Sequence, residues 1–124
     1  MEKCIFCEIA SGNIKSYKVY ENETVFAFLD IHPAGKYHTL VIPKNHYKNI
    51  FEIPEEDLLE IISVVRKLSV LYHQKLGIEN LQIISSNGVE AQLVPRAQND
   101  GQNIKWITHP EFAVEYDELV EKLK

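Results

Sequence analysis

The two cysteines of the chain, Cys4 and Cys7, form a C-x-x-C pair close to its start. The first residues lack the apolar stretch and cleavage site of a signal peptide, so we expect a cytoplasmic protein with reduced thiols. Half of a metal site, a redox pair and ordinary buried thiols are then the alternatives for the cysteines. A thioredoxin-like redox protein would need a βαβ unit after the motif, whereas residues 10–13 read as a loop that strands follow.

A second group of reactive side chains lies between residues 30 and 46. Asp30 ends one apolar stretch, His38 precedes the next, and His46 follows it. Because the ends of neighbouring antiparallel strands meet at one edge of a sheet, we expect these side chains to gather there. Two structural alternatives stay open: Asp30 as a turn-capping residue before Pro33, and His38 as a half-buried histidine with satisfied hydrogen bonds.

The elements that position these side chains are predicted from periodicity and turn residues. Pro54 and the acids after it suit a helix start, and Gly77 suits its end. We expect a helical turn over residues 5–10, strands over 17–20, 24–29, 39–42 and 81–85, and a terminal helix over 110–123. The long helix is expected to bury Leu58, Ile61, Ile62, Val65, Leu68, Tyr72 and Leu76. Strands and helices do not alternate, so the fold class is α+β with an antiparallel sheet.

Length and composition set the broad class of protein. The chain has 124 residues, 45% of them hydrophobic and 25% charged, which predicts one soluble domain over residues 1–124. Its apolar runs are too short for a membrane span. A net charge of -5 without a long basic run argues against nucleic-acid binding, although Lys36, Lys44 and Lys48 could attract a phosphate. Free nucleotides therefore suit this chain better than polymers do.

The run from Asp30 to His46, together with the C-x-x-C pair and Ser86-Asn87-Gly88, resembles the histidine triad family, in particular its bacterial, Hint-like branch. The resemblance covers nearly the whole chain and implies a nucleotide hydrolase or transferase that forms a homodimer. It matches Cys4, Cys7 and His46 to ligands of a structural zinc ion, which two thiolates and an imidazole suit. Without the cysteines, an exposed loop histidine would be the better interpretation of His46.

The resemblance also implies a purine nucleotide site. Asp30 matches an acid that accepts hydrogen bonds from the ribose hydroxyls, and His38 matches a histidine that orients or protonates at the phosphate. Asn87 matches an asparagine that holds phosphate or main chain, while a turn residue is the usual interpretation of Asn-Gly. The residues that match the apolar wall around the base are Phe6, Leu29 and Ile31, which are otherwise plain core positions.

The chain departs from the family at its defining motif, H-x-H-x-H. Here Gln92 is followed directly by Leu93-Val94-Pro95-Arg96, so a block of about nine residues, the length of a strand, is absent with all its histidines. In the family the middle histidine attacks the phosphorus of a nucleoside phosphoramidate or dinucleoside polyphosphate and forms a nucleotidyl-histidine. The fourth zinc ligand comes from the same strand. For the chain as printed we predict no nucleotidyl transfer and at most three protein ligands for zinc.

Three explanations of this absence stay open: an omission from the sequence, a deliberate excision, or a shortened, histidine-free strand over residues 92–95. Losing a central strand would leave backbone groups of both neighbours unpaired, and this cost favours the first two. The hypotheses for function are accordingly a hydrolase or transferase, an inactive nucleotide-binding or protein-interaction module, and, more weakly, a C-x-x-C redox protein.

Mass spectrometry of the intact protein separates these cases. If the natural protein contains the block, its mass will exceed the 14.3 kDa of this sequence by the mass of the block. A measured mass of 14.3 kDa would remove the nucleophile and contradict the hydrolase hypothesis for this chain.

Overall fold

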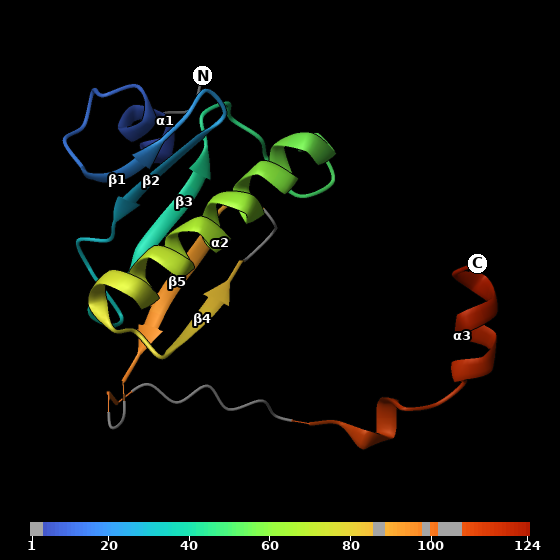
Figure 1. Cartoon of the computed structure of the whole chain (residues 1–124). Helices are drawn as coiled ribbons and strands as arrows, with labels where there is room; N and C mark the ends of the chain where they lie inside the picture. Colours follow the sequence, from blue (N-terminus) through green and yellow to red (C-terminus); the bar gives the residue numbers. More distant parts are fainter. Residues whose placement is uncertain (1–3, 86–88, 98–99, 102–107) are drawn as a thin grey trace.

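The computed structural model describes residues 4–85, 89–97, 100–101 and 108–124. Its centre is a five-stranded antiparallel sheet of order β1-β2-β3-β5-β4, with the long helix α2 across one face (Figure 1). The elements are α1 (Ile5–Ala10), β1 (Tyr17–Glu21), β2 (Val25–Leu29), β3 (Thr39–Pro43), α2 (Glu55–Leu76), β4 (Asn80–Ile84), β5 (Ala91–Arg96), the 3-10 helix η1 (Pro110–Phe112) and α3 (Tyr116–Lys122). The predicted α+β fold is confirmed.

The local signals for α2 act as predicted at both of its ends. Pro54 caps the start with an extended backbone, and the acids that follow lie in the first turn, where the helix dipole favours negative charge. Gly77 ends the helix in the left-handed region at φ 68, and its N–H donates to the carbonyl of Tyr72. Among the described residues, no helix combines the length and apolar character that a membrane crossing requires.

The two faces of the sheet are covered by different helices. Val25, Ala27 and Val41 pack with buried side chains of α2, whereas Phe26 and Phe28, which alternate with them along β2, pack with Phe6 of α1. The buried residues of α2 are Ile61, Val64, Val65, Leu68 and Tyr72.

The predicted buried face of the long helix was wrong at three positions. Ile62 and Leu76 are exposed, and Val64, which was not predicted, is fully buried. Successive helical residues differ by about 100° around the axis, so Ile62 lies on the flank of the stripe that Ile61 and Val65 define.

The predicted single helix over residues 110–123 is also wrong in detail. The chain forms η1, leaves the helical conformation, and begins α3 after Glu115, whose φ of 58 is left-handed. Figure 1 shows α3 standing away from the sheet, and its apolar residues remain exposed. Short helices gain most of their stability from packing an apolar face. Because the apolar residues of α3 are exposed, packing does not favour one continuous helix over two short ones.

β5 lies between β3 and β4, where the absent block was expected to leave a gap in the sheet. It pairs with β4 from Asn80↔Arg96 to Ile84↔Gln92 and with β3 from Thr39↔Leu93 to Val41↔Ala91. The expectation of unpaired neighbours is therefore wrong for these residues, and the structure has the shortened, histidine-free strand. The pairing is incomplete, however, because β3 continues to Pro43 while its pairing with β5 ends at Val41.

The turn between β2 and β3 lies against the far end of β5. The His38 N–H donates to the carbonyl of Gly35 at 3.2 Å, and the Asp30 N–H donates to that of His38 at 2.9 Å. A Cβ placed on Gly35 would lie 2.9 Å from the carbonyl oxygen of Pro95. Only glycine therefore lets the turn approach the strand this closely.

Replacing Gly35 by alanine should lower the free energy of unfolding by about 1–3 kcal/mol, because backbone on one side of the contact must move. Urea unfolding measures the change. Ala34→Ser, which adds one atom to an exposed side chain of the same turn, should change stability by less than about 0.5 kcal/mol. Equal stability of the two variants would contradict the close approach.

Candidate functional site

Cys4, Cys7 and His46 come together beside the start of α1. Their ligand atoms lie within 4.8 Å of one another, and the Cys7 Sγ is 3.3 Å from the His46 Nδ1. The N-terminus of α1 sets the thiol pair: Cys4 caps the helix, and the Cys7 N–H donates to the Cys4 Sγ at 3.4 Å. The structure thus gathers the three residues that the family resemblance matched to zinc ligands.

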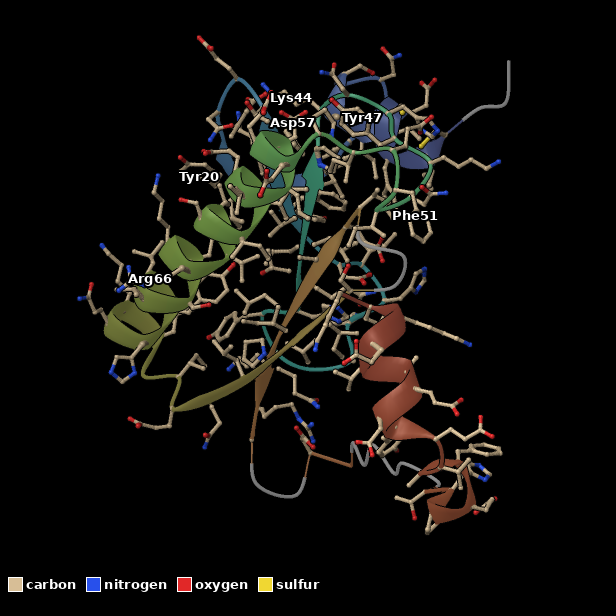
Figure 2. The ribbon with its side chains drawn as sticks, turned by 90° about the vertical axis from the view of Figure 1, so that its right-hand side faces the viewer. Tyr20, Lys44, Tyr47, Phe51, Asp57 and Arg66 are labelled. Carbon is tan, nitrogen blue, oxygen red and sulfur yellow. The ribbon has the colours of Figure 1, made fainter. Side chains whose placement is uncertain are left out.

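His46 lies on the segment between β3 and α2, and a hydrogen bond of the next residue, Tyr47, connects that segment to α2. The Tyr47 hydroxyl donates to Asp57 Oδ2 at 2.5 Å, in the first turn of α2. Figure 2 shows Tyr47, Asp57 and Lys44 at the same end of the molecule. Lys44, one of the three lysines predicted to attract phosphate, is instead 2.8 Å from Glu21 in an ion pair.

The two thiols have different acidities. Burial raises the pKa of both, but at Cys4 it is outweighed by hydrogen bonds from the backbone and thiol of Cys7 and from His46, so the pKa of Cys4 is lowered. At Cys7, the hydrogen bond and charge of Cys4 and the charge of Glu8 add to burial and raise the pKa. Cys4 therefore ionises first, and a thiolate is the form that binds metal. Sulfur, sulfur and imidazole nitrogen are a donor set that fits zinc.

A cavity of about 220 Å³ opens beside these three side chains. Its wall includes Ile42 and Pro43, where β3 has run past its pairing with β5, and Val89 and Glu90, which directly precede β5. The shortened strand therefore coincides with an open space next to the candidate metal ligands.

A separate cavity of about 250 Å³ lies under α1 on the same face of the sheet. Phe6, Leu29, Asp30 and Ile31, all predicted to contact a nucleotide, line it together. Other residues of its wall are Ile9, Ile14, Lys15, Phe28, His32 and Leu40. Asn87, the remaining predicted nucleotide contact, lies outside the described residues.

Asp30 has the turn-capping role that the sequence left open, and it also borders the cavity under α1. Its Oδ1 accepts the N–H of His32 at 2.8 Å, which caps the turn. Its Oδ2 lies 3.7 Å from the Nε2 of His38, and its side chain is 21% exposed. One oxygen therefore orders the backbone while the carboxylate as a whole still borders the cavity.

His38 is held by hydrogen bonds at both ring nitrogens. Nδ1 lies 2.8 Å from the N–H of Ala34 and must accept from it, so the proton of the neutral ring is on Nε2 and is donated to Gln92 Oε1 at 3.0 Å. The ring is only 5% exposed. His38 can reach a phosphate only if a ligand replaces Gln92 as its partner. No functional role was predicted for Gln92, and its position at the edge of the absent block was the one signal in the sequence that could have pointed to it.

Gln92→Leu should lower the free energy of unfolding by about 1–3 kcal/mol, because it removes the hydrogen-bond acceptor of the buried Nε2–H of His38 and leaves only Asp30 Oδ2, at 3.7 Å, beyond hydrogen-bond distance. Gln92→Glu keeps an acceptor oxygen and should recover much of the loss. Gln74→Leu, the same change at an exposed position of α2, is the matched control. Urea unfolding curves that coincide for Gln92→Leu and the unmodified protein would show that this hydrogen bond does not stabilise the fold.

Comparison with known proteins adds to this geometry. Residues 11–96 match the HIT domain. A HIT-like protein of Methanocaldococcus jannaschii is 38% identical over 98% of this chain and 98% of its own length. Adenosine 5′-monophosphoramidase of Schizosaccharomyces pombe is 32% identical over 97% and 95% of the two chains. The crystal structure of a HIT family protein from Bacillus anthracis has a TM-score of 0.86 at 32% identity, covering 98% of this chain and 95% of that one. With the domain match, the relatives and the shared fold in agreement, this chain belongs to the HIT, or histidine triad, family.

Proposed function

We propose that this protein binds purine nucleoside phosphates in the cavity under α1. The observation that carries the proposal is that Phe6, Leu29, Asp30 and Ile31 line one cavity. Apolar walls suit the faces of a planar base, and a carboxylate at the rim accepts hydrogen bonds from vicinal hydroxyls of a ribose. A relative named for adenosine 5′-monophosphoramidase activity supports adenosine 5′-phosphate derivatives as the ligand class.

We propose that the protein binds the nucleotide but does not hydrolyse it, because no nucleotidyl-histidine intermediate can form. Hydrolase chemistry of that kind requires a nucleophilic nitrogen, and β5 runs directly from Gln92 to Leu93 where the family has its three histidines. His38 does not replace them, because both of its ring nitrogens already have partners. A hydrolase acting on phosphoramidates or dinucleoside polyphosphates would require the absent block.

We also propose that Cys4, Cys7 and His46 bind a structural zinc ion. The closeness of the three donor atoms supports this assignment. Such an ion would join the start of α1 to the segment after β3, and so hold Phe6 over the nucleotide cavity. Stoichiometric zinc in the purified protein is the expected result, whereas a reversible Cys4–Cys7 disulfide without metal would favour the redox hypothesis.

A homodimer is the further proposal that the exposed surface supports. Among the described residues, β4 pairs with β5 alone and so presents a free edge. Ile83 on this strand is 54% exposed, and Leu59 and Ile62 of α2 are 60% and 51% exposed. Free strand edges and exposed apolar side chains are typical of surfaces that pair with another chain. Sedimentation equilibrium should give twice the mass of the chain, and a monomer would contradict the proposal.

Isothermal titration calorimetry with adenosine monophosphate should detect binding, and Asp30→Ala should weaken it at least about tenfold, the effect of losing hydrogen bonds to a charged group. Asp30→Asn keeps the turn cap but loses the charge, and it should weaken binding without unfolding the turn. Glu23→Ala, at an exposed acid outside the cavity, is the control.

Adenosine 5′-phosphoramidate should yield no product with this chain. Absence of binding to both adenosine and guanosine monophosphate, or equal affinity in the unmodified protein and both Asp30 variants, would contradict the proposed nucleotide site.

A further inference from the structure

We propose that Glu90 is the fourth ligand of the zinc site and takes the place of the ligand that the absent strand would have supplied. The inference rests on the proposed zinc site and is tested in the absence of nucleotide.

The three-residue cluster leaves one position of a structural zinc ion to be filled. Zinc in structural sites is almost always held by four protein ligands in a tetrahedron. Within the described part of the chain, the group of close donor atoms contains only Cys4, Cys7 and His46. All three border the cavity of about 220 Å³, so that cavity is where a fourth ligand can enter.

Glu90 borders the same cavity and is its one carboxylate among the described residues. Its side chain is partly buried, and no hydrogen bond or ion pair to its carboxylate is found in the described part of the chain. A carboxylate oxygen is a normal zinc ligand. Because Glu90 is not within the 4.8 Å cluster, its side chain must turn toward the ion to bind it.

The backbone at Glu90 is fixed while its side chain is free to turn. Its carbonyl accepts the hydroxyl of Ser85 at 2.6 Å, and the next residue, Ala91, is buried and paired with Val41. Glutamate has three rotatable bonds, so reorientation of the carboxylate does not require β5 to move.

The charge of the site and the position of the other nearby acid also favour Glu90 as the fourth ligand. Two thiolates and a carboxylate around Zn²⁺ leave one net negative charge, and Lys48 lies on the wall of the same cavity to offset it. Glu8, the acid next to Cys7, is outside that wall, and its Oε2 already accepts from Asn13 at 3.0 Å. Glu8 therefore serves as a matched control rather than as an alternative ligand.

The test is zinc affinity of the full chain, measured by competition with a chromophoric chelator. Glu90→Gln should weaken zinc binding about tenfold or more, and Glu90→His, which restores a strong donor, should recover it. Glu8→Gln should change the affinity by less than about twofold. Absorption of the Co²⁺ form gives a second readout, because loss of a ligand changes the coordination geometry and hence the visible spectrum of the metal.

Equal zinc affinity and an unchanged Co²⁺ spectrum in Glu90→Gln would overturn the assignment of Glu90 while leaving the other three ligands in place. A folded, unmodified protein that binds no zinc would overturn the metal site as a whole, and Glu90 with it. Neither result decides whether the cavity under α1 binds a nucleotide, which is tested separately by calorimetry.

Discussion

The pairing of β5 with strands on both of its sides is the constraint on which the rest of the structure depends. Within the described chain, β4 is joined to the sheet only through β5, and β5 is also the link to β3. Leu93 and Val94 are buried, so the strand contributes to the core as well as to the hydrogen-bonded ladder. The six residues of β5 are enough to join β4 to β3, but not to pair along the whole length of β3.

Both candidate sites are placed by the position of this strand. Gln92 on β5 holds His38, which in turn holds the backbone of the turn that carries Asp30. At the start of the strand, Glu90 borders the cavity beside the cysteines. A family member with a short central strand thus keeps the cavity under α1 but lacks the three histidines of the family motif.

Features set by neighbours in sequence could be predicted, and features set by packing between distant segments could not. The caps of α2 at Pro54 and Gly77 depend only on the residues at the helix ends, so the local sequence was sufficient to predict them. The grouping of Cys4 and Cys7 with His46 followed from the family resemblance rather than from periodicity. The exposure of Ile62 and the Gln92–His38 hydrogen bond both depend on which distant segments pack against these residues. The prediction counted the backbone hydrogen bonds that β3 and β4 would lose without the absent block. It did not count those that residues 91–96 form with both strands in its place.

Phe6 of α1 borders both cavities: the one beside Cys4 and Cys7, and the one whose wall includes Asp30. An occupant on either side therefore acts on one shared aromatic side chain. Thermodynamic linkage makes such an effect reciprocal: if a bound ion changes the affinity for nucleotide by some factor, a bound nucleotide changes the affinity for the ion by the same factor. A change in zinc occupancy would then alter nucleotide affinity through the one side chain that the two cavities share.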